Sequence, residues 1–346
     1  MKESLLYTKH KDNKIKCNLC AHYCELKNGQ YGICGVRQDI NGILYSLNYG
    51  LVQGTALDPV EKKPFYHFIP GSLVLSFGLP GCNFHCANCQ NSNLSQNIKA
   101  HRHLFNRTKS INPEMLINYA IQNKIDGIAY TYSEPTIFFE YAYDTIMESR
   151  QRKESSHLKH MFISNGYFSK ELRDKIFAGQ LLDAVNIDLK FMDDRKYKKI
   201  TGGTLQPVLD NIEAFAASSV HLEIINLVIP DENNSDDDFR KLAAFLSSVD
   251  KDIPLHFSRF FPYNKMLDRQ PTPVEQLRSA KHIAEEFGMK YVYIGNVASK
   301  ELSDTFCPSC HALLIKRHGY NTNFVNLKKE NDKYYCSICG CEINIK

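Results

Sequence analysis

The chain has 346 residues, of which 43% are hydrophobic and 23% are charged, and its formal net charge is +4. These values exclude a disordered or collagen-like chain, and so small a charge over this length argues against a nucleic-acid partner. The length predicts about two domains, or one large domain with an appendage. The opening residues lack an apolar signal-peptide core and no apolar run reaches the ~18 residues of a membrane span, so we expect a cytoplasmic protein without a membrane partner.

From residue 73 to about 296, stretches typical of strands alternate with stretches typical of helices. Strands are expected at 73–80, 126–133, 160–167, 184–191, 221–229, 254–261 and 290–295. Helices are expected at 112–124, 137–150, 169–178 and 207–218, and two more are expected to begin with capping boxes, at Ser235 with Asp238 and at Thr272 with Glu275. Such a repeat, about every 30 residues, predicts parallel β/α units, and six or seven of them suit a full or partial barrel.

The sequence changes character on both sides of this repeat. Residues 1–72 contain one group of cysteines and a polar, proline-containing stretch at 58–72, and residues 304–346 are short, polar and rich in cysteine. We therefore expect three parts. These are an N-terminal metal-binding segment over 1–72, a β/α barrel over 73–300 and a small C-terminal metal-binding module over 304–346.

The twelve cysteines fall into three groups, and none lies between Cys89 and Cys307. A disulfide framework is typical of short secreted chains, which this chain is not. Closely spaced cysteines in a reducing compartment are typical of metal sites, because neighbouring thiolates can converge on one ion or cluster. We interpret all three groups as metal ligands.

The central group, Cys82, Cys86 and Cys89, follows the first expected barrel strand with the spacing C-x3-C-x2-C. Functional residues of parallel barrels lie at the carboxyl ends of the strands. Three thiolates on one loop can hold three irons of a [4Fe–4S] cluster and leave the fourth iron open to a substrate. A zinc site with a fourth ligand, such as His85, is the alternative interpretation.

The C-terminal group has the spacing C-x2-C-x25-C-x2-C, which is the pattern of a zinc ribbon with two knuckles. The expected ligands are Cys307, Cys310, Cys336 and Cys339. Cys341 could replace Cys339, His311 could substitute, and an auxiliary iron–sulfur cluster is the rival interpretation. The N-terminal group has the spacing C-x2-C-x3-C-x9-C, and its four thiolates could bind either zinc or an auxiliary cluster. Its members are Cys17, Cys20, Cys24 and Cys34.

Polar residues accompany other expected strands, and the ends of parallel strands meet at one mouth of a barrel. Each has an ordinary structural interpretation as well: Glu134 could cap a helix, Asp188 and Lys190 could form an ion pair, His256 could be a core histidine and Asn165 a turn residue. The full set of candidate site residues is Ser133, Glu134, Asn165, Asp188, Lys190 and His256.

The cysteine motif after the first strand of a β/α barrel resembles the radical S-adenosylmethionine (radical SAM) superfamily. TYSEPT (131–136) is similar to the GGEP motif of that superfamily, although Tyr132 and Ser133 stand in place of the two glycines. NIDLKF (186–191) is similar to the D-x-K strand of glycyl-radical-enzyme activases. HFSRFFP (256–262) is similar to the strand that lines the adenine pocket. The resemblance implies that Glu134 holds the methionyl amino group. It also implies that Asp188, Lys190 and His256 orient the rest of SAM.

Nearly the whole chain further resembles the radical SAM member of the AmmeMemoRadiSam system, most specifically over 58–91. This implies a partial (β/α)6-type barrel whose [4Fe–4S] cluster cleaves SAM reductively to a 5′-deoxyadenosyl radical, which abstracts hydrogen from a substrate. The implied partners are a flavodoxin- or ferredoxin-like electron donor and AMMECR-type and Memo-type proteins. The alternatives are an activase that installs a glycyl radical on a partner protein and a non-catalytic scaffold or metallochaperone for iron and zinc.

Overall fold

The structure of the chain is a computed structural model, which describes residues 1–346 except 11, 13, 106–107 and 298–301. Its centre is an eight-stranded sheet with the order β14-β13-β12-β11-β10-β9-β8-β7. The strands β8 to β14 are parallel, and β7 pairs with β8 in the antiparallel sense. The bounds are β7 (Gln53–Pro59), β8 (Leu73–Gly78), β9 (Gly127–Tyr130), β10 (Lys159–Ser164), β11 (Ala184–Asp188), β12 (His221–Val228), β13 (Leu255–Arg259) and β14 (Val292–Gly295).

The seven parallel strands confirm the predicted α/β fold and the partial barrel, because β14 and β7 lie at opposite ends of the sheet order. Each of the seven predicted strands is present. β7 was not predicted. Its sequence, QGTALDP, offers little alternation of apolar and polar residues, and six of its seven residues are exposed or only half-buried on one edge of the sheet.

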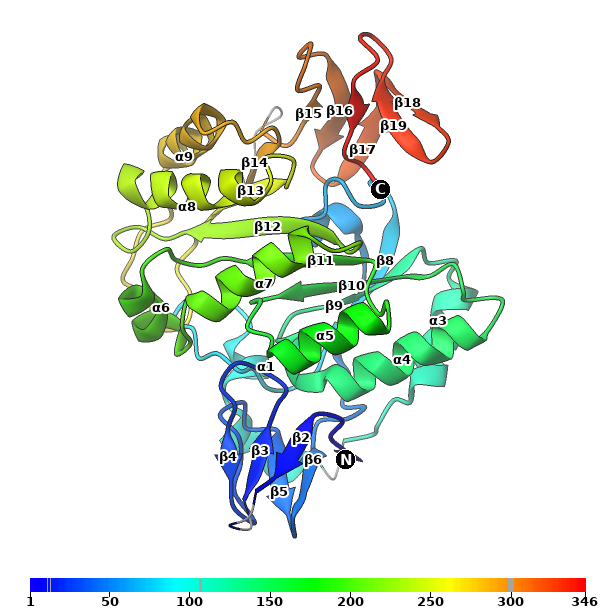
Figure 1. The fold of residues 1–346 in the computed structure, drawn as a ribbon, viewed down its shortest axis with the longest axis vertical. Helices are drawn as coiled ribbons and strands as arrows, with labels where there is room; N and C mark the ends of the chain where they lie inside the picture. The colour runs from blue at the N-terminus through cyan, green and yellow to red at the C-terminus, as the bar shows by residue number, and fades with distance from the viewer. Residues whose placement is uncertain (11, 13, 106–107, 298–301) are drawn as a thin grey trace.

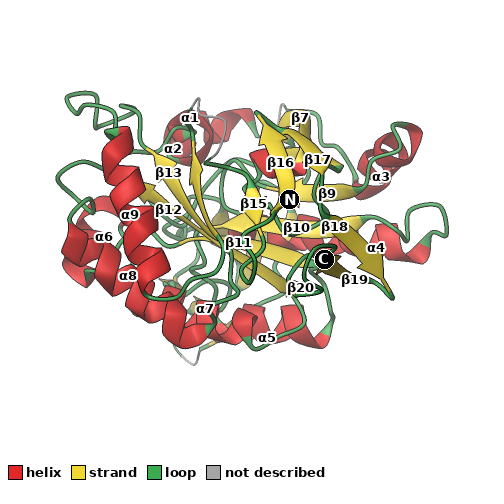
Figure 2. Ribbon diagram, turned by 90° about the horizontal axis from the view of Figure 1, so that it is seen from above, coloured by secondary structure: helices red, strands yellow, loops and turns green. Residues whose placement is uncertain are grey.

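Helices follow the strands and cover the outer face of the curved sheet (Figure 2). The longer ones are α3 (Pro113–Gln122), α4 (Phe139–Gln151), α5 (Lys170–Ala178), α6 (Asp194–Thr201), α7 (Gln206–Ala216), α8 (Asp236–Val249) and α9 (Val274–Glu286). The shorter ones are η1 (Val60–Lys62), α1 (Ser92–Ser95), α2 (Ile98–His101), η2 (Arg102–Leu104) and η3 (Pro135–Phe138). All six predicted helices are present, and α6 was missed because its eight residues are strongly charged.

The two predicted capping boxes have different outcomes. At α8 the Ser235 hydroxyl accepts from the Asp238 amide and the Asp238 carboxylate accepts from the Ser235 amide, so this box is confirmed. At α9 the predicted box is wrong, because the N-cap residue is Pro273 and no side chain caps it. The Thr272 hydroxyl instead donates to the Val228 carbonyl, 2.5 Å away, and ties α9 to the end of β12.

Residues 60–69, here called the plug, fill the inside of the barrel near the amino ends of its strands. Val60, Phe65 and Phe68 pack against inward-facing residues of β8, β9, β10 and β11, which are Val74, Ala129, Met161 and Ala184. The Glu223 carboxylate on β12 accepts hydrogen bonds from the amides of Tyr66 (3.0 Å) and His67 (2.8 Å). The plug therefore closes this end of the barrel and leaves the carboxyl ends of the strands as the open mouth.

Two small modules lie at opposite ends of the molecule (Figure 1). The N-terminal one has two three-stranded antiparallel sheets, β1-β6-β5 and β2-β3-β4. The C-terminal one, here called the ribbon, also has two, β15-β16-β17 and β18-β19-β20. The bounds are β1 (Lys2–Glu3), β2 (Tyr7–Lys9), β3 (Ile15–Cys17), β4 (Glu25–Leu26), β5 (Arg37–Ile40), β6 (Ile43–Ser46), β15 (Thr305–Phe306), β16 (Leu313–His318), β17 (Asn321–Phe324), β18 (Leu327–Glu330), β19 (Lys333–Cys336) and β20 (Glu342–Ile343).

The ribbon is bound directly to the plug. The buried Arg317 guanidinium donates to the Tyr66 carbonyl (2.7 Å) and lies 4.3 Å from the centre of the Tyr66 ring. The Lys346 amide donates to the His67 carbonyl at 2.8 Å. The ribbon thus covers the closed end of the barrel, far from the open mouth. Within the described residues, no helix has both the length and the apolarity that crossing a membrane requires.

We expect the chain to lose stability between pH 7 and pH 5 because of two buried histidines. Burial lowers the pKa of His67 to about 3 and that of His160 to about 3. Both folded-state values lie below the ordinary value of about 6.5, so the unfolded chain binds the protons first as pH falls. Each histidine should therefore cost about 2 kcal/mol of unfolding free energy at pH 5, measured by urea denaturation at both pH values.

A matched variant separates this effect from general acid sensitivity. His67 contacts the Asn344 carbonyl and the Tyr293 hydroxyl, each at 2.6 Å, whereas His282 on α9 is exposed. His67→Gln should lower stability at pH 7 and reduce the difference between pH 7 and pH 5, and His282→Gln should leave that difference unchanged. An equal pH dependence in wild type and His67→Gln would contradict the assignment.

Candidate functional site

The central cysteines lie on the loop 79–91, here called the cysteine loop, which follows β8 at the open mouth. Its backbone is bound to the end of α6, because the His85 amide donates to the Thr201 carbonyl (2.7 Å) and the Ala87 amide to the Ile200 carbonyl (3.0 Å). Phe84 packs closely on Gly203, where an added Cβ would lie 2.2 Å from the ring. A side chain at position 203 would therefore displace the cysteine loop.

Charged groups lie close to two of the three central thiols, those of Cys82 and Cys86. Burial raises the pKa of the Cys82 thiol well above its ordinary value, and the charge of Glu134 raises it further. Burial raises the pKa of Cys86 to about 12, although the nearby Lys190 ammonium opposes this. The Phe84 amide donates to the Cys82 sulfur at 3.3 Å. Since buried thiolates require compensation, these sulfurs suit positively charged iron.

Glu134 closes β9 and is buried with its carboxylate fully hydrogen-bonded. One oxygen accepts from the Thr136 amide (3.0 Å), the Thr136 hydroxyl (2.6 Å) and the Ser164 hydroxyl (2.7 Å), and the other accepts from the Asn165 amide (2.9 Å). Burial raises the pKa of Glu134, although these hydrogen bonds oppose the rise. The carboxylate both caps η3 and joins the ends of β9 and β10, next to Cys82.

Tyr132 adopts a backbone conformation that glycine favours. Its φ is +64°, in the left-handed region that glycine adopts most readily. Side-chain and backbone contacts stabilise this conformation. The Tyr132 hydroxyl donates to Asp58 at 3.0 Å, and Asn91 of the cysteine loop donates to the Tyr132 carbonyl at 2.7 Å. The neighbouring Ser133 hydroxyl donates to the Leu79 carbonyl at 2.5 Å.

Asn165, which follows β10, contacts the cysteine loop directly. Its side-chain amide donates to the Asn83 side chain at 2.7 Å, and its own side-chain oxygen accepts from the Tyr167 amide at 3.0 Å. Asn83 was not among the predicted site residues, although it follows Cys82 within the motif. The structure therefore brings Ser133, Glu134 and Asn165 to the same end of the barrel as the cysteine loop.

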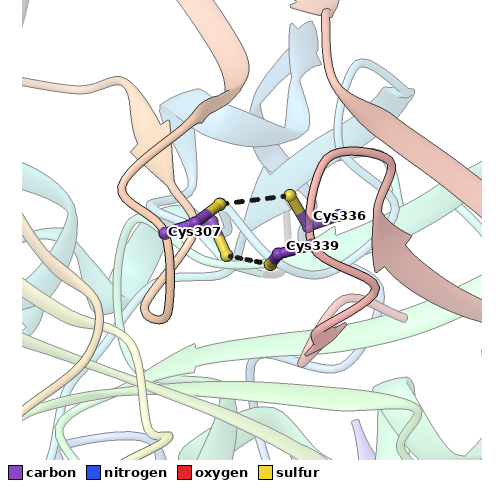
Figure 3. Close-up of side chains that lie close together, drawn as sticks. Cys307, Cys336 and Cys339 are labelled. Atoms are coloured by element: carbon purple, nitrogen blue, oxygen red, sulfur yellow. Dashed lines mark hydrogen bonds between the residues drawn. The ribbon is translucent and has the colours of Figure 1, made fainter.

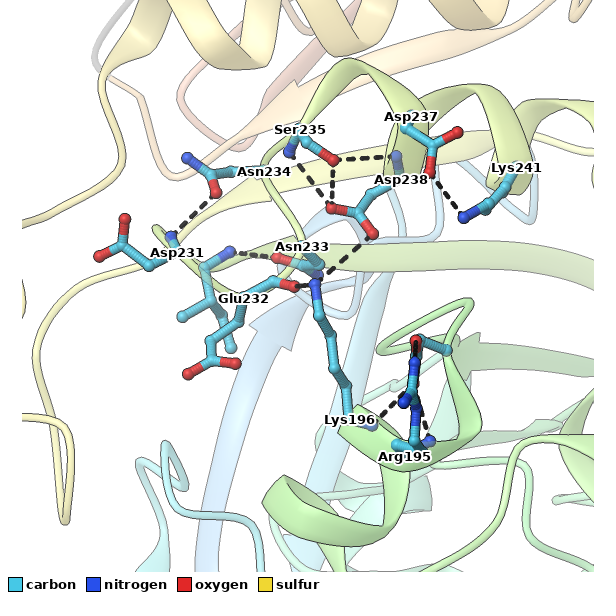
Figure 4. A network of polar contacts seen from close by, with 12 residues as sticks. Arg195, Lys196, Asp231, Glu232, Asn233, Asn234, Ser235, Asp237, Asp238 and Lys241 are labelled. Carbon is cyan, nitrogen blue, oxygen red and sulfur yellow. Dashed lines mark hydrogen bonds and ion pairs between the residues drawn. The ribbon is translucent and has the colours of Figure 1, made fainter.

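Asp188 and Lys190 lie where β11 ends, and their side chains form an ion pair. Burial opposes the charge on Lys190, but Asp188 and Cys86 outweigh it and hold its pKa above the ordinary range, so the side chain is a cation. The Lys190 carbonyl accepts from the Asn233 side chain at 2.8 Å. Asn233 belongs to the polar network between α6 and α8 in Figure 4, which fixes this strand end.

His256 has different surroundings. It lies on β13, where its ring contacts the Glu223 carboxylate at 2.7 Å and stacks with Tyr293. Tyr66 of the plug packs edge-on against the same ring. Because Glu223 also binds the plug amides, His256 belongs to the network that holds the plug.

Buried polar atoms near the cysteine loop suit a bound polar cofactor. Among the described residues, the Asp188 Oδ1, Asn83 Nδ2 and Asn88 Oδ1 atoms are buried without a hydrogen-bond partner. Such atoms are costly to bury unless a ligand satisfies them. Three thiols, an ammonium and these unpartnered atoms together match a cluster with one open iron and a ligand with amino, carboxylate and hydroxyl groups.

The ribbon brings its four predicted cysteines together (Figure 3). The sulfurs of Cys307, Cys310, Cys336 and Cys339 all lie within 4.8 Å of one another. Two sulfur–sulfur distances are 3.6 Å, between Cys307 and Cys339, and 3.7 Å, between Cys310 and Cys336. The Cys341 thiol instead donates to the Glu342 carbonyl at 3.4 Å, so the geometry favours Cys339 as the fourth ligand.

The comparisons with known proteins agree with this geometry. Residues 78–246 match the Radical SAM superfamily. An uncharacterized protein of Methanocaldococcus jannaschii is 40% identical over 346 residues, which cover all of this chain and 99% of the relative. A second protein of that organism, named provisionally as a glycyl-radical enzyme activating enzyme, is 27% identical over 211 residues, 60% of this chain and 75% of the relative.

A solved structure supports the fold. The crystal structure of a radical SAM methyltransferase from Sphaerobacter thermophilus superposes with a TM-score of 0.52 over 66% of this chain and 67% of that chain, at 12% identity. Together with the cysteine loop at the mouth of a parallel barrel, these matches show that the chain belongs to the radical SAM superfamily of enzymes.

Proposed function

We propose that the chain binds a [4Fe–4S] cluster through Cys82, Cys86 and Cys89 and cleaves SAM reductively. When bound, the cluster and SAM supply a 5′-deoxyadenosyl radical, which would abstract hydrogen from a substrate. The observation that carries the proposal is the position of these three cysteines at the open mouth, beside Lys190 and the unpartnered Asp188 oxygen. The closed end is filled by the plug, so SAM and substrate would enter from the mouth.

The residues around the cysteine loop have distinct proposed roles. Lys190 supplies a positive charge for the SAM carboxylate, and Asp188 offers an acceptor for a hydroxyl or ammonium group. Glu134 accepts four hydrogen bonds, about the number that a carboxylate can accept, so we propose that it positions Ser164 and Asn165 around the amino group. Ser133 and Asn165 hold the adjoining strand ends against the cysteine loop.

We also propose that the ribbon binds zinc. Tetrahedral zinc with Zn–S bonds of about 2.3 Å places its sulfurs ~3.8 Å apart, close to the two measured distances. A one-electron donor of the flavodoxin or ferredoxin class would be required. Membership of the AmmeMemoRadiSam group, with AMMECR-type and Memo-type partners, is a finer proposal that rests on the resemblance of residues 58–91.

A second candidate function is activation of a partner protein by hydrogen abstraction from a glycine. The observation that favours it is the similarity to the relative named as a glycyl-radical enzyme activating enzyme. Incubation with SAM and a glycyl-radical enzyme would give a glycine-centred radical signal in electron paramagnetic resonance (EPR) only if this function holds.

We expect Lys190→Met to weaken SAM binding while the iron content stays at the wild-type level. The loss of one charge-assisted hydrogen bond should cost about 1.5–3 kcal/mol, roughly a ten- to hundredfold increase in Kd. SAM binding can be followed by the change that it causes in the EPR spectrum of the reduced cluster. The matched control is Lys198→Met, on the exposed face of α6.

Equal SAM affinity in Lys190→Met and wild type would remove Lys190 from the proposed SAM site. If SAM does not change the EPR spectrum of the wild-type protein, the cluster has no open iron that binds SAM. This result would contradict the proposed function.

A further inference from the structure

The N-terminal cysteines converge beside the cysteine loop. Cys17 and Cys20 are buried, and an added Cβ at Gly32 would lie 3.7 Å from the Cys34 sulfur and 3.8 Å from the Cys24 sulfur. The Cys17 amide donates to the Cys24 carbonyl at 2.9 Å, which links β3 to the start of β4. These four thiols, contributed by two turns and two strand ends, therefore form one cluster of ligands.

Their spacing differs from that of the ribbon. Among the residues that the structure describes, the ribbon cysteines are the one group of three or more such ligand atoms that lie within 4.8 Å of one another. A single zinc ion requires this close spacing, because all four sulfurs bind the same atom. An iron–sulfur cluster holds its thiolates farther apart, because they bind different irons. In this respect the N-terminal group resembles the cysteine loop and differs from the ribbon.

Within the described part of the chain, a buried arginine next to the N-terminal thiols has one nitrogen without a partner. Arg37 is 1% exposed, and its Nε atom has no hydrogen-bond partner among the described residues. The Arg37 Cβ lies 3.6 Å from the position of an added Cβ at Gly32, beside the Cys24 and Cys34 sulfurs. A cluster with four thiolates carries net negative charge. Glu140 balances the charge of this guanidinium, so its contribution to the site is the unpartnered Nε atom, a free hydrogen-bond donor.

The N-terminal group lies against the cysteine loop on both sides of Cys82. His22, which lies between Cys20 and Cys24, donates from Nε2 to the Asn83 carbonyl at 2.8 Å. On the other side, the Cys34 carbonyl lies 3.1 Å from the position of an added Cβ at Gly81. Asn83 and Gly81 are the two neighbours of Cys82. Both neighbours of Cys82 therefore lie close to residues of the N-terminal group.

We propose that Cys17, Cys20, Cys24 and Cys34 bind a second iron–sulfur cluster that passes electrons to the cluster of the cysteine loop. A donor of the flavodoxin or ferredoxin class gives one electron to the N-terminal cluster, which is reduced and then reoxidised as that electron moves to the central cluster. The central cluster would then pass the electron to SAM, whose bond between the sulfonium sulfur and the 5′ carbon breaks to give methionine and a 5′-deoxyadenosyl radical. The relay rests on the proposed function, whereas the metal content of the N-terminal group does not.

The first test removes the central cluster and measures what remains. The variant Cys82→Ala/Cys86→Ala/Cys89→Ala, prepared anaerobically from the full chain, should retain at least two irons per chain with an equal amount of sulfide, about one zinc and an EPR signal after reduction with dithionite. Cys341→Ala is the matched control and should keep the full metal content. No iron together with about two zincs per chain would overturn the second cluster and leave the proposed function intact.

The same variant separates the inference from the proposed function. If it holds as much iron as the wild type, the central motif binds no cluster, and the proposed function fails while the N-terminal cluster stands. Cys20→Ala/Cys24→Ala tests the relay. If it keeps the central iron, reduction of that iron by photoreduced flavodoxin should be at least tenfold slower than in the wild type. An unchanged rate would overturn the relay.

Discussion

Replacing Cys82, Cys86 or Cys89 with serine is expected to abolish the release of 5′-deoxyadenosine from SAM. Each thiolate is assigned to one iron of the central cluster, and a hydroxyl is a poor replacement for a thiolate ligand. The loss should be complete within detection and accompanied by a loss of iron from the cysteine loop. The measurement is liquid chromatography of 5′-deoxyadenosine after anaerobic incubation with dithionite and SAM, next to iron analysis of the same samples.

Cys341→Ser provides the matched control for this series. Its thiol lies outside the ribbon quartet and donates to the Glu342 carbonyl in its own turn. This variant should release 5′-deoxyadenosine at the wild-type rate. A serine variant at Cys82, Cys86 or Cys89 that retains wild-type activity would show that the corresponding sulfur binds no essential iron.

Glu140→Ala is expected to lower the free energy of unfolding by about 3–5 kcal/mol, because it leaves a buried arginine without its counter-charge. Glu140 lies on α4 and its side chain is fully buried, and Arg37 of β5 is its partner in an ion pair. One Glu140 oxygen also accepts from the Arg37 Nη1 atom and the Leu5 amide, at 2.8 and 2.9 Å. This contact ties the N-terminal module to the barrel.

The same helix offers a control of identical chemistry. Glu148 pairs with Arg152 at 3.5 Å, and both side chains are about one-third exposed. Glu148→Ala should cost less than about 1 kcal/mol, because water compensates exposed ion pairs. Urea denaturation of both variants at pH 7 gives the comparison. Equal, small losses would mean that the Arg37–Glu140 pair does not hold the module in place.

The barrel could be predicted because the residue patterns that form its strands and helices lie within short stretches of the sequence. Parallel strands covered on both faces are continuous apolar runs, as in β9, where all four residues are buried. Helix starts were visible for the same reason, as at Asn112, whose side chain accepts from the Met115 amide. The spacing of the cysteines identified the ligand sets, since residues two or three apart on one turn can reach a common metal.

The plug could not be predicted, because its position depends on partners far away in the sequence. The sequence showed it only as part of a polar, proline-containing stretch, whereas Glu61 and His67 are buried. His67 is satisfied by Asn344 and Tyr293, more than 200 residues away. The location of His256 was hidden for the same reason, since Glu223 and Tyr66 reach it from another strand and from the plug.

The choice between Cys339 and Cys341 also required the structure. Both residues have plausible knuckle spacing, and only the path of the turn between β19 and β20 decides which sulfur faces Cys307. Similarly, the motif around Glu134 indicated an acid at a strand end, but the sequence could not show that four donors already occupy its carboxylate. These outcomes depend on where side chains point and not on spacing.

The most direct test of the central claim is the fate of SAM on the reduced wild-type protein. Iron-replete protein incubated anaerobically with dithionite and SAM should release 5′-deoxyadenosine and methionine in equal amounts, because the bond between the sulfonium sulfur and the 5′ carbon is the one that breaks. The release should be slow in the absence of the substrate. Protein that holds a reducible cluster and binds SAM, yet forms no 5′-deoxyadenosine, would contradict radical SAM chemistry and favour a metal-binding scaffold.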